Sequence, residues 1–260
     1  MTVSTWYSKR AKLMTMVYKA CTIVFWLIVW QIVSLWIDNI VIVPSPLSVW
    51  LALLQLSKTP LFWNSVYNSA YYIIVGFGIG TAAGVVLAVL AYKFWLIRQL
   101  LSPIITVSRA IPVASFIIFL LVVLSSKHNL SSVVAIIMVL PIVYSNTLLG
   151  LGNIDDQLKE MAQVFGVSTV KKYTYIYAYN LLPYINTGCR ISVGLAFKSG
   201  VAAELIGVVK DSIGNQLQLS KLYIMMDHVI AWTVVVVVVS VLFECIVVNM
   251  LRLVEDRLAK

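Results

Sequence analysis

The sequence predicts an all-α integral membrane protein with six spanning helices. Of its 260 residues, 61% are hydrophobic and only 11% are charged, whereas about a quarter of the residues of a soluble domain are charged. Apolar runs of roughly 20 residues recur along the chain, and a helix needs that length to cross a bilayer. The formal net charge of +9 does not imply nucleic acid, because membrane proteins concentrate Lys and Arg on their cytoplasmic side.

The apolar runs divide residues 1–260 into one transmembrane domain. The first run follows a basic segment, as in a signal peptide, but it is longer than a signal h-region and is interpreted as a retained helix. A short helix capped by Ser45 or Ser48 is expected after Pro44 and Pro46, along the outer membrane surface. The predicted spans are Met16–Ile37, Val66–Tyr92, Leu100–Leu124, Ser131–Leu151, Pro183–Val208 and Val229–Leu251.

The distribution of basic residues predicts the orientation of these spans. With the N-terminus inside, the outer segments hold only Lys58, Lys127, Lys210 and Lys221. Because cytoplasmic segments carry the excess of basic residues, this asymmetry predicts that both termini are cytoplasmic. The predicted cytoplasmic set is Lys9, Arg10, Lys12, Lys19, Lys93, Arg98, Lys159, Lys171, Lys172, Arg252, Arg257 and Lys260.

Three glycines of the second span recur every four residues. Gly76, Gly80 and Gly84 therefore form one ridge, which lets another helix approach closely inside a membrane. We expect this ridge to pack a neighbouring helix of the same subunit.

No soluble-enzyme motif is visible. The chain has no phosphate-binding G-x-x-x-x-G-K-[ST] loop, no H-E-x-x-H and no G-x-S-x-G. The cysteines Cys21, Cys189 and Cys245 lie in apolar segments without metal-ligand spacing and are interpreted as packing residues. We therefore expect no catalytic residue, metal or cofactor in this chain.

The segment Gly152–Tyr177 interrupts the apolar pattern between the fourth and fifth spans. Asn153 is a suitable N-cap for a helix whose first turn is acidic. Gly166 can adopt the left-handed conformation that ends a helix, and Ser168 can cap a second helix that leads into the fifth span. The pattern predicts a cytoplasmic helical hairpin that either packs only on its own protein or docks a cytoplasmic partner. The apolar stripe of its first helix is Ile154, Leu158, Met161 and Phe165.

This hairpin resembles the EAA motif of ABC-importer permeases, written E-A-A-x3-G-x9-I-x-L-P. Glu160, Ala162, Gly166 and Ile176 match at the right spacing. Met161 replaces the middle alanine, and Ala178-Tyr179 replace the Leu-Pro, although Leu182-Pro183 follows four residues later.

Further segments resemble the aliphatic sulfonate, taurine and nitrate branch of these permeases in the same order. They are VPSPLSVW (43–50), SRAIPVASF (108–116), PIVYSNTLLGLGNIDDQLKEMAQVFG (141–166) and AELIGVVKDSIGNQL (203–217). The resemblance covers nearly the whole chain from about residue 40 and identifies it as a type I importer permease with six spanning helices.

The resemblance implies a subunit of the bacterial cytoplasmic membrane with several partners. Two permeases, either a homodimer or two paralogues, form the pathway; cytoplasmic ATPase subunits hydrolyse ATP; and an extracytoplasmic binding protein delivers the solute. Residues 152–182 become the coupling segment. The residues expected to contact the ATPase are Glu160, Met161, Ala162, Phe165 and Gly166.

Charged residues within or beside the spans are candidates for the pathway. Arg190 and Lys198 face roughly the same side of the fifth span, with Lys198 about 20 Å into it. Lys198 either lines an anion pathway, pairs with Glu204 or Glu244, or snorkels to the surface. Arg109 is expected at the cytoplasmic end of the third span, where Pro112 can kink the helix. Lys198, Arg109, Arg190 and Glu204 are the predicted pathway residues.

Three functions fit this sequence. The first is an ABC-importer permease for a small anion such as a sulfonate, taurine or nitrate, or for a vitamin precursor. The second is a secondary transporter driven by an ion gradient, with Glu204 or Glu244 in a proton relay. The third, a membrane scaffold that transports nothing, is disfavoured by the coupling segment and the intramembrane charges.

Overall fold

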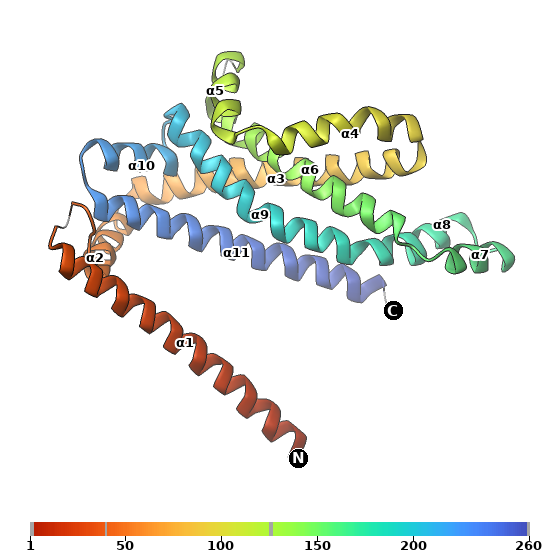
Figure 1. Cartoon of the computed structure of the whole chain (residues 1–260), viewed down its shortest axis with the longest axis horizontal. Helices are drawn as coiled ribbons and strands as arrows, with labels where there is room; N and C mark the ends of the chain where they lie inside the picture. Colours follow the sequence, from red (N-terminus) through yellow and green to blue (C-terminus); the bar gives the residue numbers. More distant parts are fainter. Residues whose placement is uncertain (1–2, 40, 125–126, 259–260) are drawn as a thin grey trace. The chain divides into compact units, whose positions relative to one another are not determined.

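The computed structural model describes residues 3–39, 41–124 and 127–258, and every regular element in these ranges is helical (Figure 1). Lys260, which belongs to the predicted cytoplasmic set, lies outside the described residues. The chain forms two compact units. One comprises Met1–Thr59 with Leu219–Trp232, and the other comprises Pro60–Gln218 with Thr233–Lys260.

In the first unit, a long helix is joined to a short one by a turn that side chains hold in place. Helix α1 spans Val3–Ile37 and α2 spans Pro46–Ser57. The Trp30 indole N–H donates to the Pro44 carbonyl at 3.0 Å. The Ser45 hydroxyl accepts the Ser48 N–H at 3.1 Å, so Ser45 is the N-cap of α2. Its position along the outer membrane surface stays a prediction.

In the second unit, three long helices form the core: α3 (Pro60–Lys93), α6 (Leu130–Gly152) and α9 (Tyr179–Gly207). They pack side by side (Figure 1). The glycine ridge of α3 lies against α6, as the sequence predicts. A Cβ atom on Gly76 would lie 2.9 Å from the Ala135 Cβ, and one on Gly80 would lie 3.1 Å from Ile136.

A matched pair of glycine substitutions tests this packing. Gly76→Ala is expected to destabilise the protein by roughly 1–3 kcal/mol, because the added methyl meets the α6 backbone and forces the helices apart. Gly78→Ala is the control, since nothing lies within 4 Å of its added Cβ. Thermal unfolding in detergent compares the two variants. Equal melting temperatures would contradict the ridge.

The third predicted span, Leu100–Leu124, is interrupted at Pro112, where the sequence predicts a kink, and it is not one continuous helix. The chain forms α4 (Trp95–Ala110) and α5 (Val113–Val123), which bend by 107° at the break. Ile111 is extended, with φ −69° and ψ 130°, because the ring of Pro112 disfavours helical backbone in the preceding residue. The proline also provides no N–H to continue the ladder.

Four helical segments are long and apolar enough to cross a membrane: Ala20–Ile37, Pro60–Lys93, Leu130–Gly152 and Met226–Glu255. The bent pair α4 and α5 makes a fifth if it counts as one span. The remaining predicted span, Pro183–Val208, falls on α9, whose 29 residues are long enough but less apolar. Several polar side chains of α9 are buried within the protein, namely Ser192, Ser199 and Glu204.

Short elements complete the chain. They are η1 (Lys127–Asn129), α7 (Asp156–Val164), α8 (Thr169–Lys171), η2 (Lys172–Ala178) and α10 (Ile213–Leu222), and the last long helix is α11 (Met226–Leu258). Within the second unit, Phe243 of α11 contacts the rings of Phe77 and Phe197, with centroids 5.3 Å and 5.8 Å away.

Candidate functional site

Helix α7 begins two residues later than the sequence suggests. Asp155 is its N-cap, and its carboxylate accepts the Gln157 N–H at 2.9 Å. Asn153, the expected N-cap, instead ends α6, and its N–H donates to the Leu149 carbonyl. The shift arises because Ile154 between them is only 4% exposed and anchors the start of α7.

The anchor of α7 is a small apolar cluster that includes a residue of the EAA motif. Ile154 packs with Leu151 at the end of α6 and with Leu181 at the start of α9. Ile176 of η2 packs against this cluster. The isoleucine of the motif therefore holds the base of the hairpin.

The end of α7 is a glycine turn, as predicted. Gly166 has φ +60°. Its N–H donates to the Gln163 carbonyl at 3.2 Å, and the Val167 N–H donates to the Ala162 carbonyl at 2.9 Å. These are the paired hydrogen bonds of a Schellman motif, which needs a left-handed residue at this position. Gly166 thus sets the direction in which the chain leaves α7.

The two faces of α7 differ. Ala162 is 2% exposed and lies on the protein side, whereas Val164 and Phe165 are 82% and 77% exposed. Met161 is about half exposed, and Leu158 is also exposed. Of the predicted stripe, only Ile154 is buried within this chain. The helix therefore presents an apolar surface, Leu158, Met161, Val164 and Phe165, which we call the α7 apolar face.

The charged residues of α7 are Asp156, Lys159 and Glu160. Glu160 is exposed and, among the described residues, makes no ion pair. Lys159 donates to Asp156 at 2.8 Å, and this hydrogen bond raises the pKa of the Lys159 ammonium. Glu160 is thus the charged residue of the motif that is available to a partner.

Behind the turn, the second helix of the hairpin is continuous with the fifth span. Thr169–Lys171 is α-helical, and Lys172–Ala178 is a π-helix that runs directly into α9. Ser168 is at the predicted N-cap, but its side chain makes no capping bond. The π-helix has no signal in the sequence; such segments are rare and are frequent at functional sites.

The predicted pathway residues do not gather at one point. Arg190 Nε lies 3.7 Å from Glu244 Oε1, linking α9 and α11 within the second unit. Lys198 is exposed, and no ion pair within the described ranges includes it, so pairing with Glu204 or Glu244, one of its three alternatives, is not formed in this structure. Glu204 is buried at 1% exposure.

Glu204 is held by groups that sequence reasoning missed. The Ser69 hydroxyl donates to Glu204 Oε2 at 2.6 Å, and the Gly214 N–H donates to the same oxygen at 3.2 Å. The Ile213 N–H in turn donates to the Ser69 hydroxyl at 2.8 Å. No sequence signal links Ser69 to Glu204, since 135 residues separate them. In this structure the carboxylate fastens α3 and α10 to the end of α9.

Arg109 does not lie where the sequence suggests. It is in the last turn of α4, at the opposite end of that helix from its first residue, Trp95. Its Nη2 donates to the Pro141 carbonyl at 2.7 Å and to the Ser145 hydroxyl. Because Pro141 is at the middle of α6, the guanidinium lies beside the middle of α6. Ser145 is a partner that sequence reasoning did not identify.

The model of the binding-protein-dependent transport system inner membrane component family matches residues 80–260, which is more than half of the chain. The chain belongs to this family of transport permeases. The matched region contains the hairpin formed by α7, α8 and η2 (156–178), which we call the α7 hairpin. It also contains the three-helix core, apart from the first part of α3. The family assignment confirms the fold class predicted from the sequence, an all-α permease of the type I importer fold.

Relatives of this permease carry names from several transport systems. The nitrate import permease protein NrtB of Leptolyngbya laminosa is 31% identical over 147 residues, which are 56% of this chain and 52% of that protein. The permease SsuC of Bacillus subtilis, named for aliphatic sulfonates transport, is 25% identical over 89% of this chain and 83% of its own. The formylaminopyrimidine transport permease protein ThiX of Halalkalibacterium halodurans is 25% identical over 70% of this chain and 72% of its own.

Proposed function

We propose that this permease works in an ATP-driven import system whose ATPase docks on the α7 hairpin. Family membership supports a multi-pass membrane subunit of an import system. The observation that carries the docking proposal is the α7 apolar face, since Val164 and Phe165 are exposed on a helix too polar to enter the bilayer. A short helix with an uncovered apolar stripe suits a groove in a partner protein.

The hairpin is built to transmit force. Its base is anchored by Ile154 and Ile176, its tip turns at Gly166, and η2 continues without a break into α9. Movement of a docked ATPase would therefore be passed to a helix in the core of the pathway. Allosteric coupling needs such a physical connection between two sites that bias one transition.

The rest of the transport system is inferred from membership of the permease family. Both termini are cytoplasmic, a binding protein docks on the outer side, and a second permease, identical or paralogous, completes the pathway. The cargo is a small anion. An exposed Lys198 and the names of the nitrate and sulfonate relatives support an anion, whereas the ThiX relative keeps a vitamin precursor as the alternative.

An ion-gradient transporter has less support. The proton-relay hypothesis needs available carboxylates, but Glu204 accepts two hydrogen bonds and Glu244 lies beside Arg190. Uptake into vesicles separates the two mechanisms. The ATP-driven system is inhibited by vanadate and persists with an uncoupler while ATP is maintained, and the reverse pattern would support the gradient.

Phe165→Ala is expected to weaken ATPase association about tenfold, because a buried aromatic anchor typically contributes more than about 1 kcal/mol to an interface. Gln163→Ala is the control, since Gln163 is exposed on the opposite side of α7. The measurement is the amount of ATPase that co-purifies with each variant. Equal recovery from both variants would show that the α7 apolar face is not the docking surface.

A further inference from the structure

The position of the Arg109 guanidinium is unusual for a membrane protein. Its acceptor Pro141 is eleven residues from Leu130 and eleven from Gly152, the two ends of α6. At the rise of an α-helix, this is about 16 Å from each end. Because α6 is long and apolar enough to span a membrane, Arg109 places a positive charge near the middle of that span. A charge at such a depth normally faces a water-filled cavity or the interior of the bundle.

This charge is not neutralised by a carboxylate in the described chain. Arg190 has Glu244 at 3.7 Å, but within residues 3–39, 41–124 and 127–258 no ion pair includes Arg109. The hydrogen bonds of Arg109 to Pro141 and Ser145 both use Nη2. A guanidinium has five N–H donors in a planar fork, so the rest of the fork can bind another acceptor. The Arg109 side chain is exposed rather than packed.

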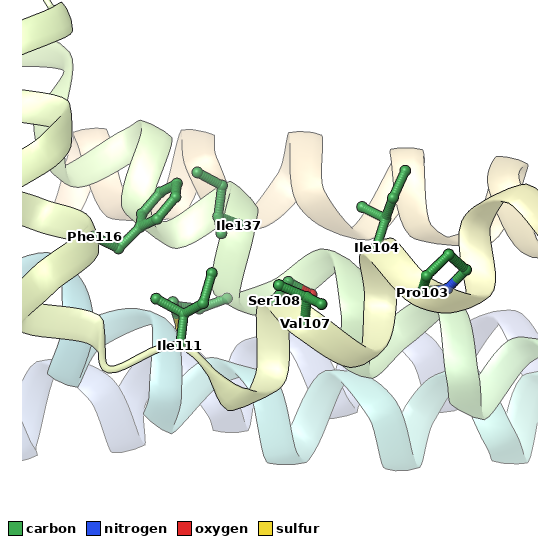
Figure 2. Close-up of a pocket in the computed structure, with 8 residues that line it drawn as sticks. Pro103, Ile104, Val107, Ser108, Ile111, Phe116 and Ile137 are labelled. Atoms are coloured by element: carbon green, nitrogen blue, oxygen red, sulfur yellow. The ribbon is translucent and has the colours of Figure 1, made fainter.

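Arg109 borders a cavity of about 230 Å³ between α4, α5, α6 and α9. A second cavity of about 460 Å³ adjoins it, and the two share Ser108, Ile111, Ile137 and Met138 as lining residues. Figure 2 shows the second cavity, whose lining is almost entirely apolar. Both cavities lie at the break between α4 and α5, since Ile111 lines each of them together with residues of both helices.

We propose that Arg109 and these two cavities form a subsite of the transport pathway that receives a small organic anion with an apolar tail. The proposal rests on the proposed import function. The planar fork of Arg109 binds an oxyanion head group such as a sulfonate in a bidentate manner, with the Ser145 hydroxyl beside it. The tail occupies the larger cavity, among residues such as Ile104, Val107 and Phe116.

The shape and polarity of the site select this class of cargo. An inorganic anion would use Arg109 but would leave the larger apolar cavity empty. A neutral apolar molecule would fill that cavity but would leave the guanidinium without an anionic partner. Ligand sites commonly combine a mostly apolar wall with a few convergent polar groups, as this one does.

The test measures ligand binding by titration calorimetry to the complete transporter, purified with its ATPase in nanodiscs. The probes are nitrate, methanesulfonate, propanesulfonate, pentanesulfonate and the neutral hexanamide. We expect affinity for the sulfonates to rise by up to about fourfold per methylene group, the factor for complete burial of one methylene. Nitrate is expected to bind more weakly than pentanesulfonate.

Two variants separate the head-group and tail sites. Arg109→Met is expected to weaken sulfonate binding by about tenfold or more, as for the loss of a charge-assisted hydrogen bond, without weakening the binding of hexanamide. Arg109→Lys is expected to restore part of the affinity. Val107→Phe fills the larger cavity and should remove the advantage of the longer tails, so that pentanesulfonate binds no more tightly than methanesulfonate.

The control is Arg98→Met, which removes another exposed arginine eleven residues earlier on the same face of α4. It is expected to bind every probe like the wild type. Unchanged sulfonate affinity in folded Arg109→Met, or affinity that does not depend on tail length, would overturn the proposal. Failure of the ATPase to co-purify would instead refute the import function. If the complex is intact but its sulfonate binding does not depend on Arg109, only this subsite is refuted.

Discussion

Gly166→Val is expected to abolish transport, with the variant still inserted in the membrane. Gly166 has φ +60°, a conformation that costs a β-branched residue roughly 1–3 kcal/mol. The chain would relieve this strain by losing the two hydrogen bonds that end α7, from Gly166 to Gln163 and from Val167 to Ala162. The α7 apolar face would then meet the ATPase at the wrong angle. Uptake and ATPase co-purification are the measurements.

Two substitutions separate backbone strain from side-chain bulk. Nothing lies within 4 Å of a Cβ atom on either Gly166 or Gly152, and only Gly166 has a left-handed backbone. Gly152→Val is therefore expected to transport normally. Gly166→Asn should recover much of the activity, because asparagine tolerates the left-handed region. Normal uptake and ATPase association in Gly166→Val would contradict the role assigned to this turn.

Glu204→Ala is expected to destabilise the permease by about 3 kcal/mol or more. The substitution leaves the Ser69 hydroxyl and the Gly214 N–H without their shared acceptor in a buried site. Each buried polar group left without its hydrogen-bond partner costs roughly 1–3 kcal/mol of desolvation. The melting temperature in detergent, followed by intrinsic fluorescence, measures the loss.

Glu204→Gln and Glu244→Ala are the comparisons. Glutamine keeps a carbonyl acceptor and nearly the same volume, so we expect a smaller loss than with alanine. Glu244 is partly exposed and pairs with Arg190 at 3.7 Å, so its removal is expected to cost less than about 1 kcal/mol. A Glu204→Ala protein as stable as Glu244→Ala would show that the buried carboxylate does not fasten the helices.

The features that the sequence predicted well depend on local chemistry. The turn at Gly166 needs a residue that adopts the left-handed region, which glycine does most readily, and the ridge of Gly76, Gly80 and Gly84 follows from helical periodicity. Helix length and composition likewise located α3, α6 and most of α11. These properties belong to a short stretch of chain and need no knowledge of distant residues.

The features that it missed depend on contacts between distant segments. Pro112 signals a break, but no local rule predicts the 107° bend that α5 makes. Hydropathy assigned residues 100–124 to one span with a kink at Pro112, so Arg109 was expected at the cytoplasmic end of that span rather than beside the middle of α6. Ser145, a partner of Arg109, is 36 residues away from it, and Ser69, a partner of Glu204, is 135 residues away. Which face of α7 stays exposed is likewise decided by packing, so Val164 was not anticipated.

The most direct test of the central claim is photocrosslinking from position 165 of the assembled transporter. A photoreactive phenylalanine analogue replaces Phe165, which is 77% exposed at the end of α7. After illumination, we predict a covalent adduct between the permease and the ATPase subunit, identified by mass spectrometry. Adducts only within the permease or with lipid, in a sample where the ATPase is bound, would contradict docking on α7.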